Sequence, residues 1–393
     1  MNINKTSFDA VVAGGGMVGA TEALLLAQAG LRVLVLDQAP PQSRAADSSP
    51  DLRVSAIGRA SVDLLRQVGA WQRMDSHYCV PYRRLETWEW ERSLVSFDSA
   101  SLNLPELGFM VENHRLQQAL WQAFTACESL TLCCPASLLD MRYEGERWHL
   151  ALDTGETVDT RLLIGADGAR SVVRQRAGIG SDGWQYRQSC LLITVECPYE
   201  QQDVTWQVFT PDGPRAFLPL YDHWASLVWY DSAARIEQLQ ALGLPALEQE
   251  VLKHFPQRLG AVKVRSVGAF PLTRSHARQY VQPGLALIGD AAHTINPLAG
   301  QGVNLGFRDA KELADVVIGA RDHQEPWADM RILKRYQYRR YGDNMLMQSG
   351  MDLFYSAFGN NLPPVRLVRN LGLMLAQRAG GLKNLALRYA LGL

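Results

Sequence analysis

The sequence lacks any excess of one charge. Its 393 residues include 39 lysines and arginines against 40 aspartates and glutamates, which gives a formal net charge of −1. This balance argues against a protein that binds nucleic acid through a global basic field. A small-molecule substrate fits the composition better.

Long apolar runs and a secretory leader are also missing. No stretch reaches the roughly 18 uninterrupted apolar residues that a membrane-spanning helix needs. Near the N-terminus Lys5 is followed by Asp9 and then by Gly14, Gly15 and Gly16, a composition unlike that of a signal peptide. We therefore expect a cytoplasmic location, and attachment to a membrane surface stays compatible with the sequence.

Cysteine is scarce, and no two cysteines have the CxxC spacing of redox disulfides or zinc sites. The six cysteines are Cys79, Cys127, Cys133, Cys134, Cys190 and Cys197. We predict reduced thiols in the core and no metal site. The length is comfortable for two domains with a sizeable core.

The N-terminal pattern predicts a βαβ unit. Residues Phe8 to Ala13 are typical of a short buried strand, Met17 to Ala29 of a helix that Gly30 closes, and Leu31 to Leu36 of a second buried strand. The segment Gly14-Gly15-Gly16-Met17-Val18-Gly19, between the first strand and the helix, matches the G-x-G-x-x-G pattern of dinucleotide-binding proteins.

Each glycine of this pattern has its own physical task. Gly14 allows the tight turn, Gly16 lets the backbone approach a pyrophosphate, and Gly19 permits close packing of helix on strand. The helix N-terminus supplies free N–H donors and partial positive charge to the diphosphate. Asp37, at the end of the second strand, is expected to bind the ribose hydroxyls of an adenosine. The pattern alone does not separate FAD from NAD, and a glycine-rich turn without a ligand is the alternative.

Two further turns favour a flavin. One, Gly165-Ala166-Asp167-Gly168, ends an apolar strand, although an ordinary Asp-Gly turn is the alternative there. The other, Gly289-Asp290, is followed by a helix expected from about Gly302 to Gly319. Asp290 can accept hydrogen bonds from a polyol chain. The positive end of the helix would stabilise the negative charge that reduction places on a flavin, and NAD has no such requirement.

Strand-like segments lie between these turns, at Tyr186 to Glu196 and Val204 to Tyr230. We predict an α/β protein in which a discontinuous Rossmann-type FAD-binding domain carries an inserted, mainly β substrate domain and a C-terminal helical tail. The predicted boundaries are 1–75, 105–180 and 275–355 for the FAD-binding domain, 76–104 and 181–274 for the substrate domain, and 356–393 for the tail.

Together, the three turns resemble in order and approximate spacing those of the class A flavoprotein monooxygenases related to p-hydroxybenzoate hydroxylase. The resemblance implies FAD as cofactor, NADH or NADPH as reductant and O₂ as co-substrate. It also implies that Asp167 lies near the cofactor and takes part in NAD(P)H use, that Asp290 binds the ribitol, and that Arg53 approaches the pyrophosphate. Asn113 is expected to contact the flavin or simply to cap a helix. Further candidate cofactor contacts are Pro297, Gly300, Gly302 and Asn304.

Within this family the sequence is similar over nearly its full length to the ubiquinone-biosynthesis hydroxylases, notably in residues 81–90, 210–220 and 348–355. This likeness implies hydroxylation of a polyprenylated benzoquinol, demethoxyubiquinol, through a flavin C4a-hydroperoxide, and membership of a biosynthetic complex. No spacing argument identifies the ring carbon. One alternative is a flavin-dependent reductase or dehydrogenase of a quinone or isoprenoid. The other is a non-catalytic flavin-binding subunit, against which the intact turns argue.

The oxygen chemistry needs an apolar pocket that excludes water. We predict that Phe217 and Pro219 face this pocket. A polar group should also meet the ring hydroxyl, because hydrogen bonding or deprotonation of that hydroxyl eases the reaction. The candidates, none of which is identified as a base, are Arg215, Tyr221, His223 and His293. A structural role is the alternative for His293.

The C-terminal segment is basic and amphipathic. No acidic residue follows Asp352, whereas basic residues alternate with apolar ones at helical spacing. These basic residues are Arg366, Arg369, Arg378, Lys383 and Arg388. Such helices can lie in the headgroup layer of an anionic leaflet, here the inner face of the cytoplasmic membrane. The alternative is packing on the protein's own core or on another subunit.

Overall fold

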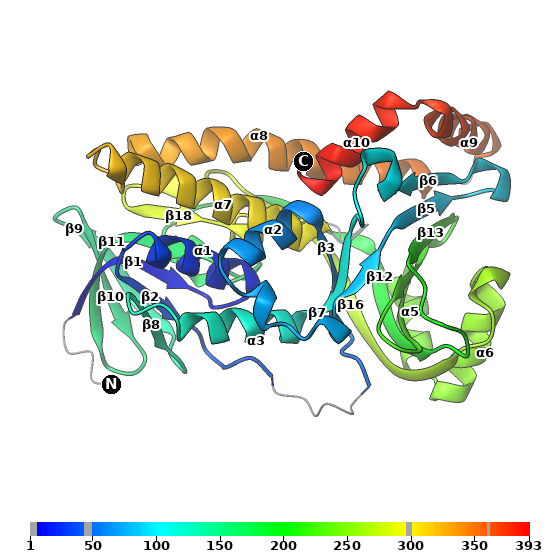
Figure 1. Cartoon of the computed structure of the whole chain (residues 1–393), viewed down its shortest axis with the longest axis horizontal. Coiled ribbons are helices and arrows are strands. Elements are labelled where there is room, and N and C mark those ends of the chain that lie inside the picture. Colours follow the sequence, from blue (N-terminus) through cyan, green and yellow to red (C-terminus); the bar gives the residue numbers. More distant parts are fainter. Residues whose placement is uncertain (1–5, 43–48, 296–300, 360–361) are drawn as a thin grey trace.

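The computed structural model describes residues 6–42, 49–295, 301–359 and 362–393 (Figure 1). Two large sheets lie side by side, and long helices cover the first of them. This is the predicted α/β class with a C-terminal helical region.

The first sheet has parallel strands at its centre. Its strands are almost entirely apolar and buried, as in Val33–Leu36, because helices and loops cover both faces. Antiparallel pairing of two further strands extends it at one side. The order is β17 (Val281–Gln282), β18 (Leu285–Leu287), β11 (Thr157–Gly165), β1 (Thr6–Ala13), β2 (Val33–Leu36) and β8 (Leu130–Cys133), with β10 (Arg147–Leu152) and β9 (Leu138–Glu144) continuing from β11.

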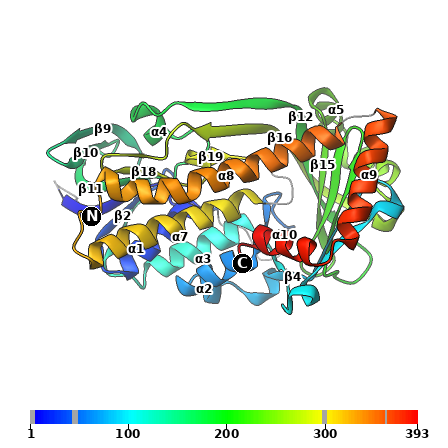
Figure 2. The ribbon, with the colours of Figure 1, turned by 90° about the horizontal axis from the view of Figure 1, so that it is seen from above.

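Four helices pack on this sheet: α1 (Met17–Gln28), α3 (Asn113–Phe124), α7 (Gln301–Asp322) and α8 (Met330–Phe358). Helix α1 contacts both α3 and α7, and α7 contacts α8, as Figure 2 shows from above. The predicted βαβ unit is confirmed, since β1 and β2 pair in parallel with Ala10 opposite Val33.

The second sheet is mixed and carries its own core. Helices α5 (Ala233–Gln240) and α6 (Leu244–His254) cover one face, where Phe217, Trp229 and Ile236 are buried together. The strand order is β19 (His293–Thr294), β16 (Lys263–Ala277), β12 (Ser181–Glu196), β15 (Trp224–Ser232), β14 (Gly213–Pro219), β13 (Val204–Thr210), β5 (Arg84–Trp88) and β6 (Val95–Asp98).

A small third sheet joins segments that the predicted boundaries assign to different domains. Strand β7 (Gly108–Glu112) pairs with β3 (Val54–Gly58) on one side and with β4 (Val80–Tyr82) on the other. Residues 76–104 are therefore divided, because β4 joins this sheet while β5 and β6 join the second sheet. Helix α2 (Arg59–Gln67) follows β3, and α4 (Val172–Arg176) follows β11.

The chain continues through α9 (Pro363–Arg378), which lies beside β6 at the end of the molecule away from β9, and α10 (Gly381–Leu391), which runs back from there toward α7 (Figures 1 and 2). Both helices fall within the predicted tail. Short 3₁₀ helices complete the fold: η1 (Trp71–Arg73), η2 (Ser76–Tyr78), η3 (Glu91–Ser93), η4 (Ser99–Leu102), η5 (Gln257–Leu259) and η6 (Gly289–Ala291).

Over the residues that the structure describes, no helix combines the length and hydropathy needed to cross a bilayer. The same residues contain no cluster of three or more His, Cys, Asp or Glu side chains able to hold a metal ion. All six cysteines are free, and Cys79, Cys190 and Cys197 are buried.

Candidate cofactor and substrate site

The first glycine turn has the geometry that its sequence predicts. Gly14 has a φ of +106°, and a Cβ there would lie 2.4 Å from the carbonyl oxygen of Ala166. A Cβ on Gly19 would lie 2.0 Å from the carbonyl oxygen of Gly14. A Cβ on Gly16 would meet nothing within 4 Å. Packing therefore requires glycine at Gly14 and Gly19, whereas Gly16 leaves open space beside the backbone, as the approach of a phosphate requires.

The start of α1 is open to an anion. Its N-cap is Gly16, no side chain caps it, and no acidic residue lies in its first turn. Asp37 buttresses the turn, since its carboxylate accepts hydrogen bonds from the backbone N–H of Gly15 at 2.7 Å and of Ala39 at 3.2 Å. The N–H groups at the start of α1 are thus available to a diphosphate. Binding of a ribose by Asp37 stays a prediction.

The second turn lies against the first. Asp167 Oδ2 accepts hydrogen bonds from the backbone N–H groups of Val172 at 2.7 Å and Val173 at 3.1 Å, at the start of α4. The other oxygen, Oδ1, is buried and has no hydrogen-bond partner among the described residues. Asp167 therefore shapes its own turn, and one oxygen remains available.

Arg174, which was not among the predicted site residues, connects the second turn to the third. Its guanidinium donates from Nη1 to the Ala291 carbonyl at 2.7 Å and from Nη2 to the Ala169 carbonyl at 2.8 Å. Burial lowers the pKa of Arg174, although the negative charge of Asp167 opposes this effect. A basic residue shortly after an Asp-Gly turn was the available signal.

In the third turn Asp290 is exposed, while its neighbour Gly289 is hydrogen-bonded to the protein. Gly289 has a φ of +56° and donates its N–H to Asp309 Oδ2 at 3.1 Å, while the Asp290 side chain is solvent-exposed. Gly302, in the first turn of α7, lines the cavity described below. The candidates Pro297 and Gly300 lie outside the described residues.

Asn304 joins α7 to the small sheet. Its Oδ1 accepts hydrogen bonds from Gly58 N at 2.9 Å and from Ser61 Oγ at 2.8 Å, and its Nδ2 donates to the Ala56 carbonyl at 2.8 Å. These contacts set where α7 begins relative to β3. The side chain of Asn304 is thus committed to protein partners, and a cofactor role for it stays a prediction.

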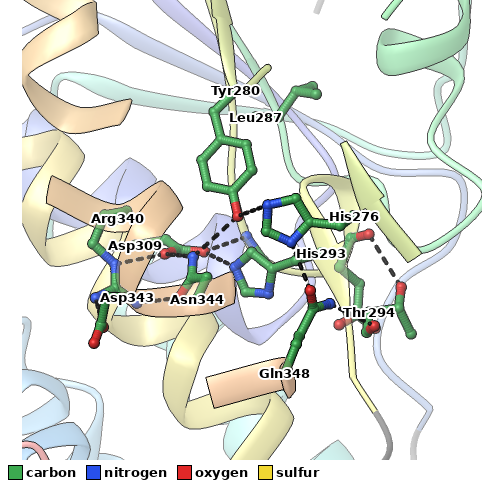
Figure 3. Close-up of polar contacts among 12 residues, drawn as sticks. His276, Tyr280, Leu287, His293, Thr294, Asp309, Arg340, Asp343, Asn344 and Gln348 are labelled. Carbon is green, nitrogen blue, oxygen red and sulfur yellow. Dashed lines mark hydrogen bonds and ion pairs between the residues drawn. The ribbon is translucent and has the colours of Figure 1, made fainter. Parts of the chain in front are cut away.

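A buried polar network lies behind the third turn (Figure 3). His293 Nε2 contacts Asp309 Oδ2, and the other oxygen of Asp309 accepts from Arg340 Nε at 2.8 Å and from Asn344 Nδ2 at 3.0 Å. Burial disfavours the charged form, but His293, Arg340 and Asn344 outweigh it and hold the pKa of Asp309 well below its usual range. His293 is only 2% exposed and does not line the cavity. The prediction that His293 meets the substrate is therefore wrong. Its alternative, a structural role, agrees with its contact to Asp309.

The network continues into the second sheet. His276 Nδ1 lies 2.6 Å from Gln348 Oε1, and Gln348 Nε2 donates to the carbonyls of Ser275 and Thr294, each at 3.0 Å (Figure 3). Helix α8 thereby holds β16 and β19 together. Desolvation lowers the pKa of His276.

A cavity of about 490 Å³ lies between the second sheet and the small third sheet. Its walls come from β3, from one face of the second sheet, from the start of α7, and from α8 and α10. From β14 the cavity receives Pro214, Ala216 and Leu218. The walls are mostly apolar, and Arg53 and Asn113 lie at the side of the nucleotide turns.

Phe217 and Pro219 were predicted to face the cavity, and this is wrong because their neighbours along β14 face it instead. Alternate side chains of a strand face opposite sides, so Phe217 and Pro219 lie on the face away from the cavity. There Phe217 stacks on Trp206 with ring centroids 5.4 Å apart. On the cavity side of β14 the side chains are the smaller Pro214, Ala216 and Leu218.

The remaining polar candidates also lie outside the cavity. Arg215 is buried over the Trp229 ring at 4.9 Å, and desolvation lowers its pKa. Tyr221 packs edge-on against Tyr78 at 4.7 Å, and burial raises the pKa of Tyr221 to about 12. His223 is exposed, with Nδ1 3.1 Å from the Tyr199 carbonyl. None of these three is placed to contact a molecule in the cavity.

Two side chains that do line the cavity have buried oxygens without a hydrogen-bond partner among the described residues, Asn113 Oδ1 and Thr87 Oγ1. Asn113 is the first residue of α3, and Glu112 occupies the N-cap position, so the cap alternative for Asn113 is wrong. Thr87 was missed. The available signal was its position two residues after Leu85 in β5, which puts both side chains on the same face, and both line the cavity. Unpaired buried oxygens are costly, which favours a ligand that satisfies them.

Taken together, the described residues fit FAD. The open Gly16 and uncapped α1 suit a diphosphate, the exposed Asp290 suits a polyol, and Asn113 beside the start of α7 suits a polar ring edge. The three turns lie against one another, since a Cβ on Gly14 would contact Ala166 and one on Gly289 would contact Val18.

Comparison with known proteins agrees with this geometry. Residues 7–342 match the family described as "FAD binding domain". The chain is 60% identical over 382 residues to the 3-demethoxyubiquinol 3-hydroxylase of Escherichia coli K12, covering 97% of this chain and 98% of that protein. It is 36% identical to the ubiquinone hydroxylase UbiL of Rhodospirillum rubrum, over 98% and 89% of the two chains.

The fold agrees as well. The crystal structure of p-nitrophenol 4-monooxygenase PnpA from Pseudomonas putida DLL-E4 superposes with a TM-score of 0.81 at 18% identity, covering 98% of each chain. The chain therefore belongs to the FAD binding domain family and, within it, to the flavoprotein monooxygenases of the ubiquinone-hydroxylase type.

Proposed function

We propose that the protein is an FAD-dependent monooxygenase that uses NADH or NADPH and O₂ to hydroxylate the ring of a polyprenylated benzoquinol, demethoxyubiquinol. The observation that carries the proposal is the cavity. Its apolar walls meet the flavin-side residues Arg53, Asn113 and Gly302 in one continuous space. The identity with the E. coli 3-demethoxyubiquinol 3-hydroxylase supports the ring as substrate.

The residues of the chain would bind and orient the cofactor. The first turn and Arg53 would hold the pyrophosphate, Asp37 the ribose, and Asp290 the ribitol. When bound, FAD supplies the transfer of electrons from NAD(P)H and the activation of O₂. The positive end of α7 would favour the reduced, anionic flavin ring.

The cavity walls would exclude water from the reacting ring. Leu85, Ala216, Leu218 and Leu272 are apolar and line the cavity from the second sheet. Dryness protects the activated oxygen from wasteful release as peroxide. Thr87 and Asn113 are the polar groups with unsatisfied oxygens available to orient a ring hydroxyl or the flavin edge.

Incorporation of labelled oxygen tests the reaction. With the FAD-loaded protein, NAD(P)H and a demethoxyubiquinol analogue under ¹⁸O₂, we expect one ¹⁸O atom in the hydroxylated product by mass spectrometry. A reductase or dehydrogenase would turn over without ¹⁸O, and a non-catalytic flavin subunit would show no substrate-stimulated oxidation of NAD(P)H. Comparison of KM for NADH and NADPH identifies the reductant. In cells, removal of the chain should cause the demethoxy precursor to accumulate.

The substrate class also bears on where the protein works. We propose that it acts on the inner face of the cytoplasmic membrane, in a complex of ubiquinone-biosynthesis proteins, with residues 356–393 as its membrane contact. The absence of acidic residues after Asp352 supports the contact. Co-purification of other ubiquinone-biosynthesis proteins with the tagged chain tests the complex.

A further inference from the structure

The outer side of α9 carries several exposed apolar side chains. Its side chains recur every three or four residues and therefore lie on one side of the helix. We define the C-terminal apolar face as the exposed residues Leu367 (50% exposed), Val368 (70%), Leu371 (48%), Met374 (36%) and Leu375 (68%) of α9 with Leu382 (72%) and Leu385 (64%) of α10. A soluble surface rarely leaves so many adjacent aliphatic side chains in water.

The inner side of α9 is fixed to the protein. Glu89, whose side chain is 2% exposed, accepts hydrogen bonds from Arg369 Nε at 2.7 Å and from Arg366 Nε at 3.1 Å. Asn370 Oδ1 accepts from Ser93 Oγ at 2.6 Å. Packing on the protein's own core, one of the two alternatives for the tail, is thus correct for this side. The orientation of the outer face follows from these buried polar contacts.

Helix α10 connects the face to the cavity. Its residues Leu387 and Leu391 are buried and line the cavity, while Leu382 and Leu385 point outward. Phe354, near the end of α8, also lines the cavity and is 50% exposed. Phe354 therefore belongs to the cavity wall and is also half accessible to solvent, shortly before α9 begins.

The charge around the face is positive. Residues 353–393 contain five basic and no acidic residues. Two of the basic residues, Arg366 and Arg369, bind Glu89, but Arg378 and Arg388 are exposed and have no acidic partner in the described part of the chain. Aliphatic side chains flanked by free cations are the composition that favours the headgroup layer of an anionic bilayer.

We infer that the C-terminal apolar face lies in an anionic lipid bilayer and that a lipid-dissolved quinol enters the cavity from the bilayer past Phe354. The inference rests on the proposed hydroxylation of a polyprenylated substrate. Helices of 16 and 11 residues are too short to span a membrane, so they lie along its surface. The ring would occupy the cavity while the isoprenoid chain stays in contact with lipid.

Vesicle binding tests the surface. The FAD-loaded full chain should float with vesicles of phosphatidylethanolamine and phosphatidylglycerol, and at least tenfold less with phosphatidylcholine alone. The double variant Leu371→Glu/Leu375→Glu should lose at least tenfold in binding to the anionic vesicles. Leu139→Glu, an equally exposed leucine of β9 at the other end of the molecule, is the matched control and should bind as wild type.

A pair of substrates separates this inference from the reaction itself. The double variant should hydroxylate a water-soluble quinol with a single isoprene unit at the wild-type kcat and KM. With a long-chain quinol in vesicles its apparent KM should rise at least tenfold. The inference would be overturned if the double variant bound vesicles as well as wild type does. It would also be overturned if light scattering showed that wild type is a dimer and the double variant a monomer. Failure of both proteins on the short quinol would instead contradict the proposed function.

Discussion

Glu22 is a buried carboxylic acid in α1, fully inaccessible and without a hydrogen-bond partner among the described residues. Burial, with repulsion from Asp315 and Asp309, raises its pKa well above the usual value. The folded protein therefore holds a proton that the unfolded chain releases above about pH 4.3. As pH rises above that value, Glu22 lowers the free energy of unfolding by about 1.4 kcal/mol per pH unit. The loss stops once pH passes the raised pKa of Glu22 in the folded protein.

Glu22→Gln should remove this loss, since the amide is neutral at every pH. We expect the free energy of unfolding at pH 8 to be higher than that of wild type, with little change at pH 4, in urea titrations followed by circular dichroism. Glu128→Gln, an exposed acid on the loop after α3, is the control and should change nothing. Parallel pH profiles for wild type and Glu22→Gln would contradict the assignment.

The glycines of the first turn should separate ligand binding from stability. Gly16→Ala adds a methyl group that meets no protein atom, so the apoprotein should unfold within about 0.5 kcal/mol of wild type. The Kd for FAD, measured by quenching of flavin fluorescence, should rise at least tenfold because the methyl group occupies the approach of the pyrophosphate. Gly19→Ala should lose about 3 kcal/mol of stability, since its methyl group would lie 2.0 Å from the Gly14 carbonyl. Equal stability of the two variants would contradict these separate tasks.

At the scale of elements, β14 shows what a sequence pattern leaves open. Every second side chain of a strand faces the same side, but apolar residues occur on both sides of β14, so the pattern did not determine which set faces the cavity. Phe217 and Pro219 were predicted to face it, but both lie on the opposite side, where Phe217 joins the core under α5 and α6. Knowledge of which face the helices cover was needed, and it depends on contacts between distant segments.

The observed register gives a direct test. Ala216→Phe should fill part of the cavity and raise KM for the quinol at least tenfold while the melting temperature stays within a few degrees of wild type. Leu252→Phe, on the partly exposed side of α6, should leave both quantities unchanged. If Ala216→Phe binds substrate normally, the cavity is not the substrate site.

The contact between α9 and the β5–β6 region depends on one carboxylate. Hydrogen bonds and charge from Arg369 and Arg366 outweigh burial and hold the pKa of Glu89 below its usual value, so the contact persists at neutral pH and weakens only as pH falls below about 4. Glu89→Gln should increase hydrogen exchange in residues 363–378 at pH 7 by at least tenfold. Glu91→Gln, exposed in the same region, is the control. Unchanged exchange in both variants would show that apolar packing alone holds α9.

For the molecule as a whole, three turns far apart in sequence converge on one path, so FAD should stabilise the entire chain. At a free concentration 100 times the Kd, FAD is expected to add about 2.7 kcal/mol to the free energy of unfolding. Addition of FAD to the apoprotein should raise its melting temperature by several degrees. AMP, which would contact only the first turn, should bind more weakly and therefore raise the melting temperature much less at the same concentration as FAD. An equal shift with AMP at that concentration would contradict binding of one FAD by all three turns.

Local signals predicted much of this arrangement. The βαβ unit, the tasks of Gly14 and Gly19, and the helix after Gly289-Asp290 follow from glycine geometry and apolar periodicity within short windows. Arg174, the Asp309 network and Thr87 left weaker signals in the sequence. The contact of Arg174 with Ala291 joins segments more than a hundred residues apart, the Asp309 network joins α7 with β19 and α8, and the role of Thr87 depends on which face of β5 meets the cavity. Likewise, Arg215, Tyr221 and His223 have suitable chemistry, but tertiary packing directs them elsewhere.

The cavity is closed by β3 near the beginning of the chain and by α10 far along it, where Arg308 Nη2 donates to the Ala390 carbonyl at 2.8 Å. During synthesis on the ribosome, the glycine turns and α7 therefore emerge well before the last wall of the cavity. We therefore expect a nascent chain to bind flavin before it can enclose a quinol, because the cavity is complete only after α10 has docked.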